Sequence, residues 1–161
     1  MTKDVNIIKK DRMRFTKNTI SSTFCYLSIL FNVFYFVSIY SSNVGNYYYN
    51  ITIGLSVVYN LLFLLFSFLC SEGVKNYNKY MSFVMIGLGA LQIGRIFYIP
   101  IKAHSTTISL EGTEILVMDD KQFVFVLIWL ALSAAFGIAA GVIGVIKTNT
   151  LENYKKETGL A

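Results

Sequence analysis

The fold is decided by an unbroken apolar run, FVFVLIWLALSAAFGIAAGVIGVI, at residues 123–146. A helix of this length rises about 36 Å, which is enough to cross a hydrocarbon core about 30 Å thick. Three further apolar runs of similar character precede it in the chain. The four predicted membrane spans are residues 18–40, 51–70, 81–101 and 123–146. The sequence therefore predicts an all-α membrane protein built as a four-transmembrane-helix bundle.

Basic residues are distributed unevenly along the chain, and such residues stay on the cytoplasmic side of a membrane. Six of the 14 Lys and Arg residues precede the first span, whereas loop 41–50 carries no charge and the next outer loop carries four acidic residues. We therefore expect both termini in the cytoplasm and a location in the cell membrane. The expected regions are a basic N-terminal segment at 1–17, a membrane domain at 18–146 with an outer loop at 102–122, and a cytoplasmic tail at 147–161.

The composition limits the function classes that the chain can serve. It is 55% hydrophobic and 14% charged, so the short tails and loops leave no room for a soluble catalytic domain. The spans contain no Asp, Glu or His, which disfavours proton-coupled carriers and haem proteins. We expect no catalytic residue, no metal site and no cofactor. The net charge of +5 comes mostly from the N-terminal segment, where topology explains it, and we expect no nucleic-acid binding. Heavy use of Asn, Ile, Lys, Phe and Tyr suggests a low-GC bacterial source.

Small residues recur at helical spacing in two spans, which is typical of close helix packing in membranes. The main expected packing face, on the fourth span, consists of Ser133, Gly137, Ala140, Gly141 and Gly144. A weaker face on the third span consists of Gly87, Ala90 and Gly94. We expect these two helices to pack together, or one of them to receive a partner.

Two amides, Asn32 and Asn60, lie at similar predicted depth in the first two spans. Antiparallel neighbours joined by a short loop could pair through them, with a value of about 1 kcal/mol. Such amides could instead help to line a polar cavity for a solute.

Arg95 is the only charged residue in the predicted spans, and Gln92 lies one turn deeper on the same helix. The arginine side chain could snorkel to the outer headgroups or reach Asp119 and Asp120. Alternatively, Gln92 and Arg95 present donors to an anion, a lipid phosphate or a partner carboxylate.

The outer loop contains two β-prone runs, residues 106–110 and 113–118, around Glu111 and Gly112. This pattern predicts a short β-hairpin. Because an isolated hairpin is marginal in water, it should lie on the bundle or pair with another chain.

Two functions remain after these exclusions. A small non-catalytic accessory or regulatory subunit of a larger membrane complex, in particular a transporter, requires no unseen chemistry. Its partners are the lipid bilayer and either other membrane subunits or further copies of itself. The alternative is a stand-alone oligomeric transporter or channel for a small solute, with Asn32, Asn60, Gln92 and Arg95 along its path.

Overall fold

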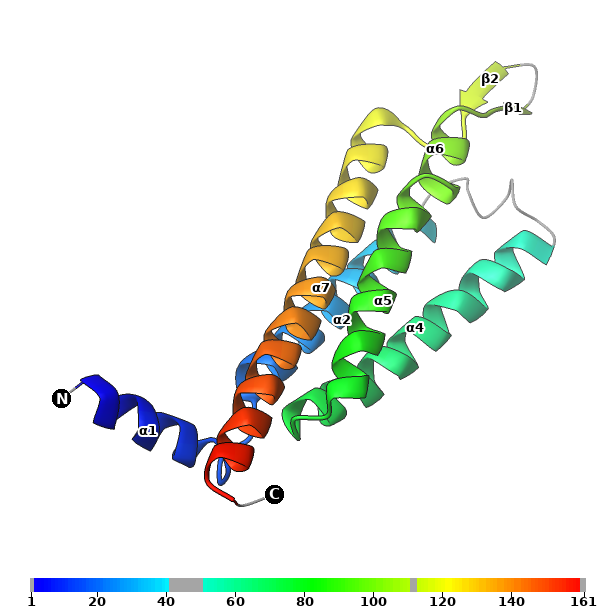
Figure 1. Cartoon of the computed structure of the whole chain (residues 1–161). Coiled ribbons are helices and arrows are strands. Elements are labelled where there is room, and N and C mark those ends of the chain that lie inside the picture. The colour runs from blue at the N-terminus through cyan, green and yellow to red at the C-terminus, as the bar shows by residue number, and fades with distance from the viewer. Residues whose placement is uncertain (1, 41–50, 111–112, 160–161) are drawn as a thin grey trace.

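Four long apolar helices dominate the computed structural model, which describes residues 2–40, 51–110 and 113–159 (Figure 1). Each of the four is long and apolar enough to cross a membrane, so the expected multi-pass helical architecture is confirmed. The elements are α1 (Thr2–Arg12), α2 (Thr19–Tyr40), α4 (Ile51–Lys75), α5 (Lys79–Ile96), α6 (Ile99–His104), β1 (Thr107–Leu110), β2 (Thr113–Leu116) and α7 (Asp120–Glu157).

Local sequence signals explain where several helices begin and end. Asn78 and Asp119 occupy the N-cap positions of α5 and α7, where their side chains accept hydrogen bonds from backbone N–H groups three residues on. Pro100 lies in the first turn of α6, and α5 ends before it because proline cannot donate a hydrogen bond to the carbonyl group one turn earlier and its ring clashes with that group. The third candidate span therefore consists of α5 followed by the short helix α6, together Lys79–His104.

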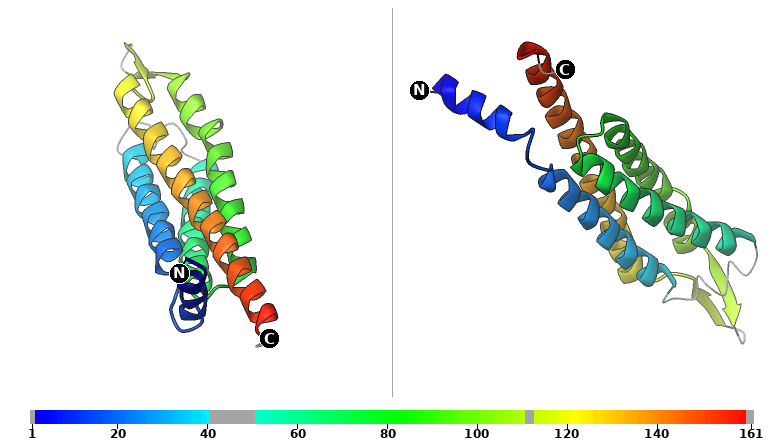
Figure 2. Two further views of the ribbon diagram at one scale, coloured as in Figure 1. Left: turned by 60° about the vertical axis from the view of Figure 1, so that its left-hand side comes forward. Right: turned by 90° about the horizontal axis from the view of Figure 1, so that it is seen from below.

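Helix α7 runs the length of the bundle and packs against both α2 and α5, while α4 packs on α2 and α5 (Figures 1 and 2). Buried residues recur at alternating steps of three and four along these helices, which is the spacing of left-handed coiled-coil packing. On α2 this buried seam consists of Ser21, Cys25, Ser28, Asn32, Tyr35 and Ile39. Large apolar side chains instead cover the outside. Among the described residues, many buried positions are therefore small or polar, although a few large side chains such as Tyr35 and Phe63 are buried with them.

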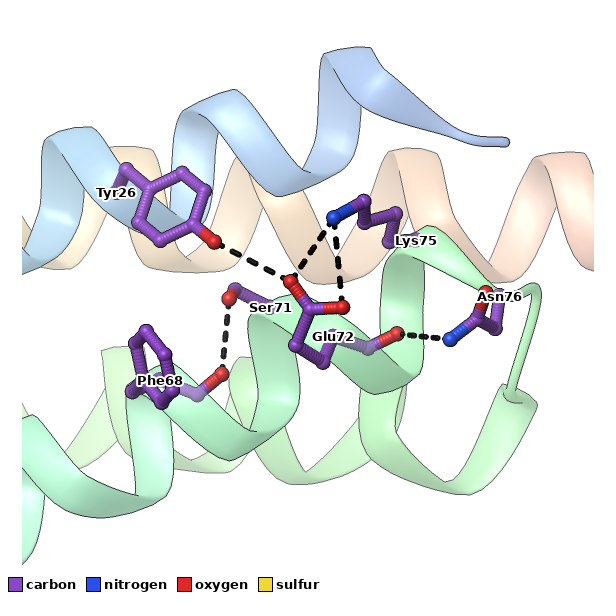
Figure 3. A network of polar contacts seen from close by, with 6 residues as sticks. All are labelled: Tyr26, Phe68, Ser71, Glu72, Lys75 and Asn76. Carbon is purple, nitrogen blue, oxygen red and sulfur yellow. Dashed lines mark hydrogen bonds and ion pairs between the residues drawn. The ribbon is translucent and has the colours of Figure 1, made fainter. Parts of the chain in front are cut away.

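The end of the bundle that holds both termini is tied together by polar contacts. The Asn18 backbone N–H donates to the Lys75 carbonyl oxygen at 2.9 Å, and Lys147 Nζ donates to Asn18 Oδ1 at 3.0 Å. Figure 3 shows the adjoining network, in which Lys75 Nζ and the Tyr26 hydroxyl both donate to Glu72 Oε1. These contacts join the start of α2 to the ends of α4 and α7. Helix α1 points away from this end of the bundle (Figure 2).

At the opposite end, β1 and β2 pair antiparallel, with Thr107 opposite Leu116 and Leu110 opposite Thr113 (Figure 1). The expected turn at Glu111 and Gly112 lies outside the described residues. Directly after β2, Val117 and Met118 are fully buried and pack with Tyr35, Val126 and other core residues. The chain that returns from the strands therefore closes this end of the bundle.

Candidate functional site

Four polar side chains singled out by the sequence form two hydrogen-bonded pairs, one helical turn apart along α5. Gln92 Nε2 on α5 donates to Asn32 Oδ1 on α2 at 2.7 Å. One turn further along α5, the Arg95 guanidinium donates through NH1 to Asn60 Oδ1 on α4, also at 2.7 Å. We call Asn32, Asn60, Gln92 and Arg95 the polar centre. It joins α2, α4 and α5 through hydrogen bonds between side chains.

The expected direct pairing of Asn32 with Asn60 is wrong, because α5 supplies the partner of each amide. The Asn60 amide nitrogen donates back to the Ser56 carbonyl oxygen of its own helix at 2.9 Å. Its oxygen then remains as an acceptor for the charged guanidinium, a stronger donor than a neutral amide. Equal depth placed the two amides at the same level, but it did not determine which neighbour each one faces.

The Arg95 side chain turns into the bundle and is only 8% exposed. Its guanidinium carbon lies 4.4 Å from the ring centre of Tyr35 and 4.7 Å from that of Tyr59. A second guanidinium nitrogen lies 3.3 Å from the Ser56 hydroxyl oxygen. Aromatic faces attract cations and hydroxyl oxygens accept from them, so this pocket holds the charge entirely with neutral groups.

The expected contacts of Arg95 with Asp119 and Asp120 do not form. Asp119 accepts from the Gln122 backbone N–H as the cap of α7, and Asp120 lies 3.7 Å from His104 Nε2. Within the described residues, Arg95 makes no ion pair with any carboxylate. Arg95 therefore does not snorkel, and its charge stays buried without a counterion from the described part of the chain.

Some polar atoms around Arg95 keep unused bonding capacity. Among the described residues, the Asn32 amide nitrogen, the Gln92 amide oxygen and the Tyr59 hydroxyl are buried without a hydrogen-bond partner. Such atoms are costly to leave unpaired in an apolar environment. The polar centre is thus a place where further donors and acceptors could be matched.

A groove between α4 and α5 leads to the guanidinium from the side of the bundle. Its volume is about 530 Å³. Its lining is apolar apart from Arg95, Ser56 and the tyrosine hydroxyls, and consists of Leu55, Ser56, Val58, Tyr59, Leu62, Leu91, Arg95, Tyr98 and Ile99. In the view of Figure 1 the ribbons of α4 and α5 diverge toward the end that holds β1 and β2. The groove combines a hydrocarbon-like wall with one buried cation.

The small residues of α7 lie at a close helix contact with α5. A Cβ atom at Gly141 would lie 2.6 Å from the Ser82 carbonyl oxygen, and one at Gly137 would lie 3.5 Å from Gly89 Cα. Ser133, Ala140 and Gly144 are buried on the same side of α7. The backbones approach so closely that larger side chains have no room.

The two helices pack together as expected, but the predicted stripe on α5 does not face α7. Gly87, Ala90 and Gly94 are all exposed, and nothing lies within 4 Å of a Cβ atom at Gly87 or Gly94. The residue that meets α7 is Gly89, whose Cβ atom would lie 3.1 Å from the Ala134 carbonyl oxygen. The buried side of α5 is marked by Ser82, Met85, Gly89 and Gln92, whose spacing was readable in the sequence.

Sequence reasoning also missed the hydroxyl groups that join α2 to α7. The Ser28 hydroxyl donates to the Ser133 carbonyl oxygen at 2.7 Å, and the Ser133 hydroxyl donates to the Ser28 carbonyl oxygen at 2.9 Å. The buried roles of Ser56, Tyr35 and Tyr59 around Arg95 were missed in the same way. Seams of small and polar residues at steps of three and four are the signal that identifies most of them.

The polar centre offers three amides and one guanidinium, and the neighbouring Ser56, Tyr35 and Tyr59 add hydroxyls; such groups bind and orient other molecules. In the described part of the chain, no cluster of three or more His, Cys, Asp or Glu side chains is arranged to hold a metal ion. Comparison with known proteins finds no matching family model, no similar curated protein and no similar solved structure.

Proposed function

We propose that this chain is a non-catalytic accessory subunit of a larger membrane assembly, in particular a bacterial transporter. In this proposal the four spans lie in the cell membrane with both termini in the cytoplasm. The Lys and Arg residues before the first span support that orientation. They lie at the end of the bundle that holds the termini, and basic residues stay on the cytoplasmic side of a membrane.

The observation that carries the proposal is the buried charge of Arg95. A cation inside a membrane span is expensive and is usually found paired or at a functional site. Here the described residues around the guanidinium supply an amide, a hydroxyl and two aromatic rings. In this proposal a partner subunit supplies a carboxylate that pairs with the Arg95 guanidinium when the assembly forms.

The internal packing gives separate support to a scaffold function. Three helices are held by direct contacts, through the Ser28 and Ser133 hydroxyls and the close approach of α5 to α7. The Gln92 amide meets Asn32 at 2.7 Å, leaving no space between them for a solute. Side chains that bond one another directly stabilise a bundle rather than line a path through it.

The test is purification of the tagged protein from its own host in a mild detergent or in native nanodiscs, followed by quantitative mass spectrometry. We expect a second membrane protein in fixed stoichiometry, whose identity then gives the function of the assembly. A homogeneous species that contains this chain alone would contradict the accessory function.

The alternative, a stand-alone oligomeric solute transporter, is favoured by the gathering of four polar residues in two adjoining hydrogen-bonded pairs. The double variant Asn32→Leu with Gln92→Leu separates the two functions, because it removes both members of a hydrogen-bonded pair and so leaves no orphaned group. A scaffold should keep its fold and its partner. A polar transport path should lose solute flux in liposomes.

A further inference from the structure

The groove between α4 and α5 places its charge in the middle of an apolar surface. On this side of the groove the lining consists of Leu91 and Arg95 on α5 and of Tyr98 and Ile99 at the start of α6, so mainly apolar side chains precede and follow Arg95. On α4 the lining extends from Leu55 to Leu62, with Ser56 beside the guanidinium. An occupant must therefore be apolar both above and below the group that meets Arg95.

This arrangement fits a transmembrane helix better than a lipid. A phospholipid carries its charge at one end, at the headgroup layer, with apolar chains on one side only. Arg95 lies about 9 Å below the outer end of the predicted third span, well inside the hydrocarbon region. A helix that carries one Asp or Glu within an apolar run has the required order of apolar, charged and apolar surface.

The outer face of α5 continues the groove as a second seam. Gly87, Leu91 and Gly94 follow one another on α5 at steps of four and three, Tyr98 lies four residues further at the start of α6, and all four are exposed. That spacing is the one used for helix packing on the buried side of the same helix. Because Cβ atoms at Gly87 and Gly94 would meet nothing, a second helix could approach the α5 backbone closely.

We propose that the groove between α4 and α5, with the exposed seam of α5, receives a transmembrane helix of a different protein, and that an Asp or Glu of that helix pairs with Arg95. The inference rests on the proposed accessory function and names the chemical class of the partner. A second copy of this chain is not the occupant, because the apolar spans predicted from its sequence, residues 18–40, 51–70, 81–101 and 123–146, contain no Asp or Glu. Charge complementarity therefore requires a heteromeric contact.

Photo-crosslinking in the host membrane tests the contact with Arg95 intact. p-Benzoylphenylalanine replaces Leu91 in the groove or, as a matched control, Val124 on α7; these side chains are 58% and 52% exposed. We expect Leu91→p-benzoylphenylalanine to crosslink to a span of the co-purifying protein that has an Asp or Glu within about one turn of the crosslinked residue. The Val124 probe should not yield that segment.

Several outcomes would overturn the inference and leave the accessory function standing. These are a Leu91 crosslink to lipid alone, to a second copy, or to a span without an acidic residue, and capture of the partner from Val124 only. Recovery of no stoichiometric partner in the parent purification would instead reject the proposed function itself.

Variants of the charge and of the groove give a second readout. Arg95→Gln should lower the amount of co-purifying partner about tenfold or more, while Arg14→Gln, which changes an exposed arginine, should not. Leu91→Trp obstructs the groove while all four residues of the polar centre are kept, and should have a similar effect, with Val124→Trp as its control. Each variant must elute as a monodisperse species when purified alone. Normal partner recovery with both Arg95→Gln and Leu91→Trp would sink the inference.

A charge reversal makes the test specific to the pair. Arg95→Glu should abolish recovery of the partner, and replacing the acidic residue of the crosslinked span by Arg should restore it. Failure of the reversal, when both proteins are inserted and each single variant is defective, would show that the two residues do not pair.

Discussion

The two sides of α5 differ in how closely they pack against their neighbouring helices. On the side that faces α7, the two backbones lie so close that a Cβ atom at Gly89 or at Gly141 would overlap the neighbouring helix. On the side that faces α4, side chains bridge the helices through Arg95, and a groove of about 530 Å³ stays open. The first contact therefore leaves no room between the helices, whereas the second leaves open space beside a buried charge.

Breaking the contact of α5 with α7 should have the largest effect on the isolated protein. Gly141→Leu forces a side chain against the Ser82 backbone and should lower the free energy of unfolding by about 3 kcal/mol. The measurement is denaturation in detergent followed by fluorescence of Trp129, the single tryptophan, which stacks on Phe31. Gly87→Leu, at an exposed position of α5, is the control and should unfold close to the parent. Equal losses at both positions would refute the assignment of the two sides.

On the side of α5 that faces α4, removing the Asn60 acceptor and removing the Arg95 charge should change the free energy of unfolding by different amounts. Asn60→Leu leaves the Arg95 guanidinium without its shortest hydrogen bond and should cost about 2 kcal/mol. Arg95→Met removes the buried charge itself, and the free energy of unfolding of the isolated chain should change by less than about 1 kcal/mol. The same denaturation assay compares the two. A larger loss for Arg95→Met would mean that the cation stabilises the fold and is not reserved for a partner.

The hydroxyl contact between α2 and α7 should contribute a moderate amount. Ser28→Ala with Ser133→Ala removes two reciprocal hydrogen bonds and should lower the free energy of unfolding by about 1 kcal/mol. Ser67→Ala is the matched control, because that hydroxyl is fully buried and has no hydrogen-bond partner among the described residues. Its removal should be neutral or slightly stabilising, so destabilisation by Ser67→Ala would point to a partner for that hydroxyl.

The smallest expected effect comes from the exposed seam of α5. Gly87→Ala and Gly94→Ala add methyl groups in open space and favour the helix, so each should stabilise the isolated protein by about 0.5 kcal/mol. In the assembled complex the same methyl groups should hinder close approach and lower the yield of partner. The free energy of unfolding of the isolated chain should therefore rise, while the yield of partner that co-purifies from the host falls. Parallel changes would argue against a helix on this seam.

Hydropathy located the four apolar helices, because long apolar runs without charge have few other stable structures. The residues of the polar centre were found for a similar reason, since each is an exception within an apolar run. The hydrogen-bond partners of these residues were not predicted. The depth of a residue along a span can be read from the sequence, whereas the helix that it faces depends on the rotation of each helix about its own axis.

The predicted contact of Gly87, Ala90 and Gly94 with α7 does not form, and this has a definite physical cause. Small residues at steps of three and four mark a surface suited to packing, but α5 carries two such surfaces. Only the row of Gly89 faces α7, and the other row is exposed. A single sequence does not tell which surface is used within the chain. The buried polar residues on the row of Gly89, Ser82 and Gln92, were the better guide.

Helix α7 has 38 residues and no proline, and therefore extends about 57 Å as one continuous rod. Near one end the Tyr154 hydroxyl donates to Asp11 on α1 at 3.4 Å, and the other end begins directly after the buried Val117 and Met118. A single helix therefore connects the segment that follows the strands with the end that holds both termini, and no loop interrupts that connection.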